Sequence, residues 1–383
     1  MEGALKITHI GPDSQLLKLA SELFESIAPG ANEYIVINDS GEGPLRFPIR
    51  HGCVRIVAWP ILGAARILFD VRGSDMIIAH SMTPHAAVAF GSARPKTIKV
   101  WSGWGFDYYG NDESPNAGLL GTATLALSAA LANASNTQES IVAFKRRFTG
   151  KISRRLIHNA AAKADYFSAP IPEDLSVFKG RFPEFHGQYS QLNYGNVGDT
   201  FAGARRLEGG ENILVGNSAS FSNNHLEIFD QLAVLDISAR KIVVPLSYGN
   251  PEYRDEIVVR GRKLFGEAFM PLVDMLSLEE YLSVVASCNV VIMNHKRQQA
   301  LGNIGAALYH GAHLFLDEAS TTVDFFRSRG AFIHTTNELE ADGLPGEPLP
   351  AAAVAANRRV LETFWGSEKV VRNAEALIGQ LNG

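Results

Sequence analysis

The sequence predicts an α/β protein of two doubly wound domains, each with a parallel sheet covered by helices on both faces. Short apolar runs alternate with helical patterns along both halves of the chain, which is typical of such sheets. The chain has 383 residues, about twice the length of an ordinary domain. We expect an N-terminal domain over residues 1–205, a C-terminal domain over 206–345, and a helical tail over 346–383 that packs back across the seam.

The first half contains short β-rich runs separated by apolar residues at helical spacing. Helices are expected at 14–27, 61–71 and 83–91, and helical patterns continue to Lys163. Residues 180–210 lack long periodicity, which is typical of a connection between domains. Strands are expected at 4–10, 33–38, 53–59, 76–80, 97–103 and 164–170, the last of them ending this half.

The second half repeats the alternation more cleanly, with six strands and five helices. In doubly wound sheets, ligands bind outside the carboxyl ends of the strands, so the loops that follow the strands are the candidate sites. Strands are expected at 212–217, 241–248, 268–272, 289–295, 312–317 and 331–336. Helices are expected at 222–235, 251–265, 277–288, 297–311 and 321–330.

Composition and charge exclude several classes of protein. Lys and Arg number 35 against 40 Asp and Glu, a net charge of −5, so nucleic acid is not an expected partner. Only two cysteines, Cys53 and Cys288, are present, which excludes a disulfide framework and a Cys-rich zinc site. The N-terminal residues lack the features of a signal peptide, and we expect a cytoplasmic protein.

One stretch, between Glu113 and Glu139, contains no charged residue and has the length of a membrane span. Ala, Gly, Thr and Ser predominate, so insertion into a bilayer is marginal. We favour a buried Ala-rich helix packed closely against its neighbours, with a membrane-inserted element as the alternative.

The strongest chemical signal is VGNSASFSNNHLE (215–227), where a strand ends in a glycine and a polar loop leads into a helix. Hydroxyls, amides and free backbone N–H groups at a helix N-terminus favour a diphosphate. The alternative is an ordinary loop in which Ser222 caps the helix.

A second loop, MNHKRQQALGNIG (293–305), also follows a strand and opens a predicted helix. Cations at a helix start are unfavourable for the helix unless an anion lies nearby, which indicates a ligand. Gly302 and Gly305 would let the helix lie close to its sheet or to the ligand. The alternative is a solvated basic helix start. The donor groups in this loop are His295, Lys296, Arg297, Gln298 and Gln299.

Three ordered motifs, VGNSxxxSNxH, VVPxxYG and RQQxLGN, closely resemble those of the bacterial enzymes that transfer 4-acetamido-4,6-dideoxygalactose (N-acetylfucosamine) from a dTDP sugar to lipid II of enterobacterial common antigen. The resemblance covers most of residues 211–340. It implies a GT-B glycosyltransferase, in which two Rossmann-like domains face a cleft. The matching positions are Gly216, Asn217, Ser218, Ser222, Asn223 and His225, then Pro245, Tyr248 and Gly249, then Arg297, Gln298, Gln299, Gly302 and Asn303. The resemblance and the loop chemistry together predict that these residues except Pro245 and Gly249, together with His295, bind the nucleotide-sugar donor.

In the first half, Trp104-Gly105-Phe106-Asp107 is similar to a Trp-Gly-x-Asp element of the same family. Rings stack on sugar faces and a carboxylate accepts from hydroxyls, so the acceptor is expected here. The alternative is that Trp101 and Trp104 are core residues and Asp107 is a cap. The candidate acceptor residues are Trp101, Trp104, Asp107 and Tyr108.

Glycosyl transfer needs stabilisation of the departing diphosphate and, if configuration inverts, a base for the acceptor hydroxyl. No Asp-x-Asp triplet occurs, so no metal or other cofactor is expected. We assign charge stabilisation to Arg297, the loop of Ser218 and Ser222, and helix N-termini. The candidate bases are Asp107, His80 and His85; in a retaining reaction these residues would only orient the acceptor.

Residues 141–158 carry a basic strip, which a helical wheel places beside apolar side chains. Such a surface binds anionic lipid headgroups, so the inner face of the cell membrane and a polyprenyl-diphosphate-linked acceptor are possible partners. The alternative is a solvated face with core packing. The strip comprises Arg147, Lys151, Arg154 and Arg155, with Phe148, Ile152 and Leu156 alongside.

The sequence therefore predicts a metal-independent glycosyltransferase that moves a deoxyamino sugar from a dTDP donor, or another nucleotide donor, to a lipid-linked or other saccharide. Two other functions remain open. A nucleotide-sugar epimerase of the same fold would convert donor without acceptor. A non-catalytic nucleotide-sugar-binding protein would never release nucleoside diphosphate.

Overall fold

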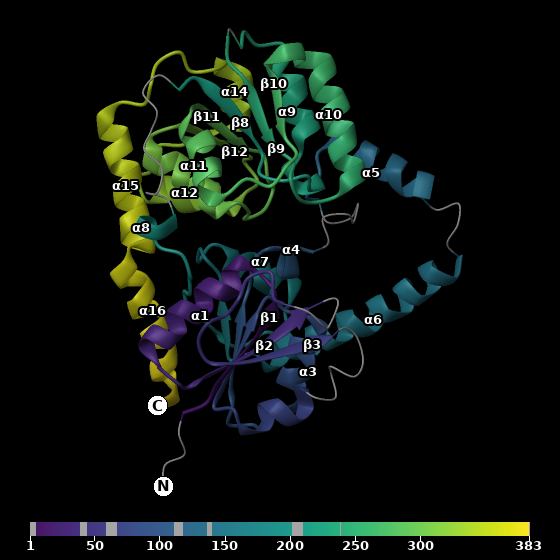
Figure 1. Ribbon diagram of the computed structural model, residues 1–383, viewed down its shortest axis with the longest axis vertical. Helices are drawn as coiled ribbons and strands as arrows, with labels where there is room; N and C mark the ends of the chain where they lie inside the picture. The colour runs from purple at the N-terminus through teal and green to yellow at the C-terminus, as the bar shows by residue number, and fades with distance from the viewer. Residues whose placement is uncertain are drawn as a thin grey trace. The chain divides into compact units, whose positions relative to one another are not determined.

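The computed structural model describes residues 5–38, 44–58, 67–110, 118–135, 140–200, 210–237 and 239–382. The chain divides into two compact units, each with its own parallel sheet (Figure 1). The first unit comprises Met1–Tyr109, Glu139–Gly195 and Glu368–Gly383. The second comprises Gly110–Gln138 and Asn196–Ser367. This division differs from the predicted boundaries because 110–138 lies with the second unit and the end of the chain with the first.

The sheet of the first unit has the order β3-β2-β1-β4-β5-β6-β7, and every pair of neighbours is parallel. Its strands are β1 (Ile7–Pro12), β2 (Asn32–Asn38), β3 (Cys53–Ala58), β4 (Met76–His80), β5 (Ile98–Ser102), β6 (Tyr166–Ser168) and β7 (Gln188–Tyr189). Its helices include α1 (Gln15–Ile27), α3 (Pro84–Ser92), α4 (Phe106–Tyr109), α6 (Ser140–Lys163), α7 (Asp174–Arg181) and α16 (Ser367–Gly379).

Two apolar clusters form the core of this unit. Leu23 and Phe24 of α1 and Leu377 of α16 pack on the side of the sheet that carries Ile7. Phe90 of α3 and Phe178 of α7 belong to the other large cluster. The alternation of strands and helices thus produces the predicted sheet with apolar cover on both faces.

The prediction that residues 164–170 hold the last strand of the first half is wrong. A seventh strand, β7, lies within the segment expected to be a connection, and it pairs with β6. β7 has only two residues, Gln188 and Tyr189, which is too short for any periodicity to show in the sequence.

The sheet of the second unit has the order β10-β9-β8-β11-β12-β13 and is also parallel. Its strands are β8 (Asn212–Val215), β9 (Ile242–Pro245), β10 (Phe269–Leu272), β11 (Cys288–Met293), β12 (His313–Leu316) and β13 (His334–Thr335). Its helices include α5 (Thr122–Ser135), α8 (Val197–Thr200), α9 (His225–Leu232), α10 (Pro251–Phe265), α11 (Leu278–Ala286), α12 (Leu301–His310), α13 (Thr321–Ser328), α14 (Thr336–Asp342) and α15 (Ala351–Trp365).

Both sheets follow the strand order of dinucleotide-binding folds, in which the direction of winding reverses between the first and fourth strands. The reversal falls between β1 and β4 in the first unit and between β8 and β11 in the second. The carboxyl ends of these strand pairs are therefore where each unit is expected to bind a ligand.

Two helices of the second unit begin later than predicted. The helix expected from 222 begins at His225, because Asn224 has φ +49°. The helix expected from 297 begins at Leu301, because Ala300 has φ +58°. Left-handed residues without glycine's freedom interrupt a helix; Asn adopts this conformation more often than most residues, whereas alanine gives no sign of it in the sequence.

The uncharged stretch forms α5, which packs on the core of the second unit through Leu125, Leu127 and Leu131. The predicted Ala-rich helix therefore packs against its neighbours, but its burial is wrong: its described alanines are mostly exposed and its leucines make the contact. Within the described residues, no helix is long and apolar enough to cross a membrane.

The start of α5 is fastened to α9. Glu227 accepts hydrogen bonds from the Thr124 backbone N–H (2.9 Å) and hydroxyl (2.6 Å), and so caps the helix. The Asn224 carboxamide accepts from the Gly121 N–H at 2.8 Å. A Cβ on Gly121 would lie 2.3 Å from Glu227 Oε1, so any other residue there would displace the Glu227 side chain.

The helix predicted over 141–158 is present as α6, which runs without a break through Gly150. Arg154, Arg155 and Ile152 are exposed, while Leu156 packs on the core. The side chains of Arg147, Phe148 and Lys151 lie outside the described residues.

The predicted tail forms two helices, α15 in the second unit and α16 in the first. Arg358 of α15 donates from Nε to the Tyr309 carbonyl at 2.8 Å, which fixes α15 to α12.

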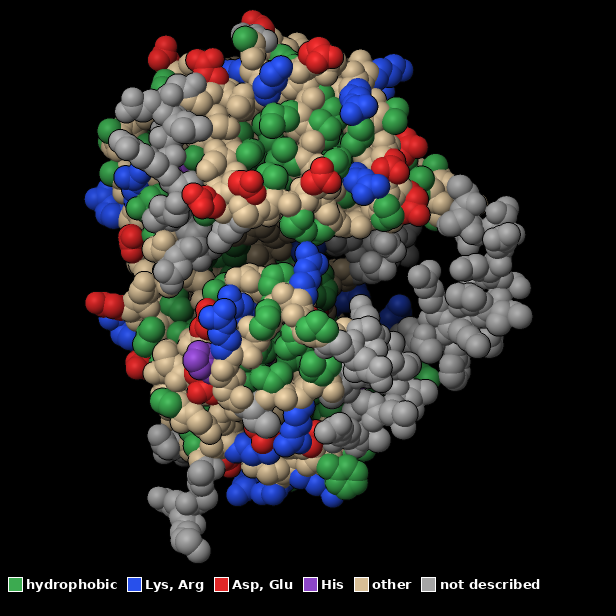
Figure 2. Space-filling view, viewed as in Figure 1, with side chains coloured by type: hydrophobic (Ala, Val, Ile, Leu, Met, Phe, Trp, Pro, Cys, Tyr) green, Lys and Arg blue, Asp and Glu red, His purple; other side chains and the backbone are tan. Residues whose placement is uncertain are grey.

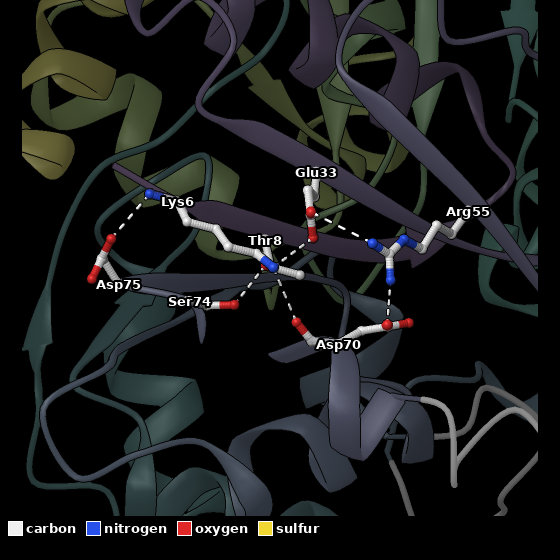
Figure 3. Close-up of polar contacts among 7 residues, drawn as sticks. All are labelled: Lys6, Thr8, Glu33, Arg55, Asp70, Ser74 and Asp75. Carbon is white, nitrogen blue, oxygen red and sulfur yellow. Dashed lines mark hydrogen bonds and ion pairs between the residues drawn. The ribbon is translucent and has the colours of Figure 1, made fainter. Parts of the chain in front are cut away.

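Charges at the amino ends of the first sheet are paired with one another (Figure 3). Lys6 Nζ lies 2.9 Å from Glu33 Oε2, and Arg55 contacts both Glu33 and Asp70. The Lys6 backbone N–H donates to Asp75 at 3.0 Å. Over the face drawn in Figure 2, positive and negative side chains are interspersed, which fits the small net charge.

The contact between α5 and α9 predicts a local loss of stability. Glu227→Ala removes the cap of α5, which is worth about 1 kcal/mol, and we expect amide hydrogen exchange over 122–131 to accelerate about 5-fold. Glu252→Ala, at an exposed position in the first turn of α10, is the control. Equal exchange of α5 in the two variants would contradict the capping role of Glu227.

Candidate functional site

The first predicted loop begins at Gly216, the residue that follows β8. Its φ is +68°, and a Cβ there would lie 2.5 Å from His225 Nε2 and 2.7 Å from Asn223 Oδ1. The glycine is therefore required both by the backbone conformation and by the close approach of two side chains. It lets the polar loop fold back against the strand end.

The Asn223 carboxamide organises this loop. Its oxygen accepts from the Asn217 backbone N–H at 2.8 Å, and its nitrogen donates to the Ser220 carbonyl and the Ser218 hydroxyl, both at 3.1 Å. The Asn223 side chain is fully buried. Two backbone partners thus fix which atom of the carboxamide is oxygen and which is nitrogen.

The second predicted loop is bonded directly to the first. His295 Nε2 lies 3.0 Å from Asn223 Oδ1 and 3.2 Å from Asn217 Oδ1, and Gln299 Nε2 donates to Asn217 Oδ1 at 3.1 Å. The Ser222 hydroxyl donates to Gln299 Oε1 at 2.8 Å and caps no helix. The loops that follow β8 and β11 therefore form one polar network at the switch point, which we call the donor-loop network.

Tyr248, from the loop of the VVPxxYG motif, belongs to the same network because its hydroxyl accepts a hydrogen bond from Asn217 Nδ2 at 2.9 Å. Tyr248 is 52% exposed, and Asn217 and Gln299 are half-buried. These three side chains are the most exposed parts of the network, whereas Ser218, Ser222, Asn223 and His225 are almost completely buried. Most of the residues that match the family motifs therefore hold the loop conformation from buried positions.

Arg297 places a positive charge beside the network. It is 6% exposed, its Nη1 donates to the Gln298 carbonyl at 3.4 Å, and its own carbonyl accepts from Ser320. Because α12 begins at Leu301, Arg297 and Gln298 belong to the loop before the helix. A buried guanidinium at a switch point favours an anionic ligand group.

Gly302 and Asn303, two residues of α12 predicted to bind the donor, have less clear roles. Space for a Cβ at Gly302 is open, so this glycine does not serve the expected close approach to the sheet. Asn303 is half-buried on α12.

Burial keeps both histidines of the network neutral. Desolvation lowers the pKa of His225 to about 3, and its Nδ1 lies 3.1 Å from the Tyr253 hydroxyl. Desolvation, together with the charge of Arg297 and the neighbouring His225, lowers the pKa of His295 well below its ordinary value.

In the first unit, Asp107 ties the loop after β5 to the loop after β4. Its carboxylate accepts from the Met82 N–H (2.8 Å), Trp101 Nε1 (2.7 Å) and the Trp104 N–H (2.8 Å). Burial raises the pKa of Asp107, against the lowering effect of these hydrogen bonds. With three donors already bound, the carboxylate is better suited to positioning the loop than to accepting a proton.

His80 lies in a buried chain of hydrogen bonds with fixed direction. Asn32 Nδ2 donates to the Ala28 carbonyl, so Asn32 Oδ1 faces His9 Nε2 (3.1 Å) as the acceptor. His9 Nδ1 then accepts from His80 Nε2 at 2.9 Å, and His80 Nδ1 accepts from the Tyr194 hydroxyl at 2.6 Å. Both nitrogens of His80 are engaged and its side chain is fully buried, which favours a positioning role over the predicted role as a base.

The remaining predicted residues of the first unit divide between core and surface. Trp101 and Tyr108 are fully buried against Phe178, so neither has an exposed ring face for the predicted acceptor contact. His85 is 2% exposed in the first turn of α3, and burial lowers its pKa. Trp104 is half-buried.

The aromatic residue that the structure does expose at this edge is Phe106, at 51%, which the sequence analysis did not select. Its neighbour in the sequence, Asp107, holds the loop that presents it.

Sequence reasoning also missed residues that act through distant partners. Tyr194 bonds His80 across 114 positions of the chain, and His9 bonds it across 71. Asn224 donates to the Leu119 and Asn294 carbonyls, across 105 and 70 positions. The one usable signal was the doublet Asn223-Asn224, because Asn is the side chain that best tolerates a left-handed backbone.

Across the described residues, no group of three or more His, Cys, Asp or Glu side chains is placed to hold a metal ion.

The chain has the GT-B fold, and solved structures resemble it over nearly its whole length. A glycosyltransferase from Rickettsia africae has 11% sequence identity and a TM-score of 0.66, with 99% of each chain covered. The alpha,alpha-trehalose 6-phosphate synthase from Burkholderia multivorans has 11% identity and a TM-score of 0.65, covering 99% of this chain and 96% of that one. The lipopolysaccharide outer core galactosyltransferase WaaB has 10% identity and a TM-score of 0.59, covering 98% and 99%.

The protein is a glycosyltransferase. Residues 199–343 match the family described as 4-alpha-L-fucosyltransferase, glycosyl transferase group 56. The matched segment contains both loops of the donor-loop network, so the family likeness and the polar geometry coincide in the same part of the chain.

The buried histidines predict acid sensitivity of the first unit. His9 has its pKa lowered to about 4 by burial, whereas in the unfolded chain it titrates near 6.5. Between these pH values the unfolded chain binds more protons. The free energy of opening therefore falls as the pH falls, by up to about 1.4 kcal/mol per pH unit for each such histidine.

Hydrogen exchange of β1 and β4 between pH 7 and pH 5, corrected for intrinsic rates, measures this slope. We expect His9→Leu to be less stable than wild type at every pH, because Asn32 Oδ1 loses its hydrogen-bond donor. Its stability should, however, fall less steeply as the pH is lowered. His51→Asn, at an exposed position, keeps the wild-type slope. A wild-type slope in His9→Leu would refute the assignment.

Proposed function

We propose that this glycosyltransferase moves an N-acetylfucosamine-like deoxyamino sugar from a dTDP-sugar to a lipid-linked saccharide in bacterial surface polysaccharide synthesis. The donor-loop network carries the proposal, because it joins the two loops whose motifs resemble the dTDP-sugar enzymes. The fucosyltransferase description of the matched family supports a 6-deoxy sugar.

In the proposed reaction, the bond between the sugar's anomeric carbon and the β-phosphate oxygen breaks, and negative charge develops on the departing nucleoside diphosphate. Arg297 stabilises this charge from a buried position, where electrostatic interactions are stronger than in water. Asn217, Tyr248 and Gln299 supply neutral donors at the open side of the network. Charge stabilisation then needs no metal ion, which is why we propose a metal-independent enzyme.

We place the acceptor in the first unit, at the loop of Trp104, Phe106 and Asp107. Asp107 fixes the loop, and Phe106 offers an exposed ring on which a sugar face can stack. The fixed hydrogen bonds of Asp107 and His80 support orientation of the acceptor rather than removal of its proton.

A lipid-linked acceptor implies work at the cytoplasmic membrane face. The exposed residues Ile152, Arg154 and Arg155 of α6 support this part of the proposal, since a basic strip beside an apolar side chain binds anionic headgroups.

Substitution of Arg297 tests the donor site. We expect Arg297→Ala to lower kcat/KM for sugar transfer by about 10²- to 10³-fold, the usual effect of removing one strong stabiliser of developing charge. The measurement is release of nucleoside diphosphate from a dTDP-sugar in the presence of the lipid-linked acceptor. Arg260→Ala, which removes an exposed arginine paired with Asp230 in the same unit, is the control and stays within about 2-fold.

Unchanged kinetics in Arg297→Ala would refute the site. A binding panel of dTDP, UDP, GDP and CMP sugars with the wild-type protein identifies the nucleotide, and preference for CMP would refute the dTDP-sugar proposal. Conversion of donor without acceptor would instead indicate an epimerase.

A further inference from the structure

One nitrogen of His295 has a fixed role. Asn223 Oδ1 must be an oxygen, because the other carboxamide atom donates to the Ser220 carbonyl and Oδ1 accepts the Asn217 N–H. An oxygen cannot donate, so His295 Nε2, 3.0 Å away, carries the ring proton. The 3.2 Å contact with Asn217 Oδ1 agrees, since that oxygen also accepts from Gln299.

The other nitrogen of His295 is then a bare acceptor. The imidazole is neutral, because burial and the nearby Arg297 hold the pKa well below its ordinary value. Its Nδ1 has no hydrogen-bond partner among the described residues, and the residue is 2% exposed. A buried acceptor without a donor costs about 1–3 kcal/mol, so its retention beside a polar network indicates a ligand group.

A second buried nitrogen in the same place also lacks a partner in the described part of the chain. It is His225 Nε2, which lies against Gly216. The polar atoms of Asn217 and Asn223 thus have hydrogen-bond partners, whereas one ring nitrogen of each of the two histidines has none among the described residues.

We propose that His295 Nδ1 accepts a hydrogen bond from the transferred sugar, from a hydroxyl or an amide N–H. The inference rests on the proposed function and deepens it, because it makes His295 a residue that recognises the transferred sugar. A diphosphate does not fit this position, since its oxygens are themselves acceptors. In a nucleotide sugar, most hydroxyl and amide donors are on the sugar ring.

The glutamine variant separates the two nitrogens. In His295→Gln the side-chain amide reaches the position of Nε2 and can still donate to Asn217 and Asn223, but no atom replaces Nδ1. The quantity measured is the ratio of two dissociation constants by calorimetry, for dTDP-4-acetamido-4,6-dideoxygalactose and for dTDP. We expect the variant to bind the nucleotide sugar about 3- to 10-fold more weakly and dTDP as tightly as wild type does.

Tyr248→Phe is the matched control. It removes one hydrogen bond of Asn217 at the open side of the network and leaves His295 unchanged. The ratio of the two dissociation constants is expected to stay at the wild-type value, even if both affinities fall.

Equal weakening of both ligands in His295→Gln, or no weakening of either, would overturn the inference and leave the proposed function standing. If the wild-type protein bound none of the dTDP, UDP, GDP or CMP sugars, the proposed function and the inference would both fall. Preference for a UDP, GDP or CMP sugar would refute the dTDP donor of the proposed function, and an unchanged ratio of dissociation constants in His295→Gln for that sugar and its nucleotide would overturn the inference.

Discussion

The buried carboxamide of Asn223 is the interaction on which the site of the second unit depends. It joins the end of β8 to the end of β11, through the Asn217 N–H on one side and His295, 72 positions later in the chain, on the other. The loops that follow neighbouring parallel strands are distant from each other in the sequence. The backbone hydrogen bonds between the strands do not set how these loops are oriented relative to each other. Asn223 does so here at the centre of the donor-loop network, and the bonds of Gln299 to Asn217 and Ser222 add further links between the two loops.

In the first unit, a different set of residues joins the two strands at the point where the winding reverses. β4 occupies the place in its sheet that β11 occupies in the other, and it too leads to a buried neutral histidine. His80 reaches back to His9 of β1, across the strand pair where the winding reverses. Buried polar chains are costly when incomplete and rigid when complete, so a fully paired chain at the switch point produces a stiff edge. The chain through His80 has a partner for each ring nitrogen, whereas His225 Nε2 and His295 Nδ1 of the second unit have none among the described residues.

Much of the fold follows from periodicity in the sequence. Strong helical patterns, such as that of α10 over 251–265, have the predicted bounds, and the strand order places the two donor loops side by side. The failures have specific physical causes. Two-residue β7 has no period, and Asn224 and Ala300 are left-handed without being glycine. Which face of a short strand or helix is buried depends on packing partners distant in sequence, so the sequence could not decide whether Trp101 binds the acceptor or packs in the core, and both Trp101 and Tyr108 lie in the core.

The segment matched by the family covers less than the unit that contains it. Residues 199–343 include neither α5 nor α15, yet Leu125, Leu127 and Leu131 of α5 cover the core of the second unit. Asn224 and Glu227, which accept hydrogen bonds from the Gly121 and Thr124 N–H groups, follow Asn223 closely in the chain, so α5 is attached next to the residue that organises the donor-loop network. A fragment limited to the matched segment would expose that apolar surface and leave Glu227 without the groups it caps. The donor-loop network and the helix attached to it therefore come from two separate stretches of the chain, although the recognisable motifs all fall in one.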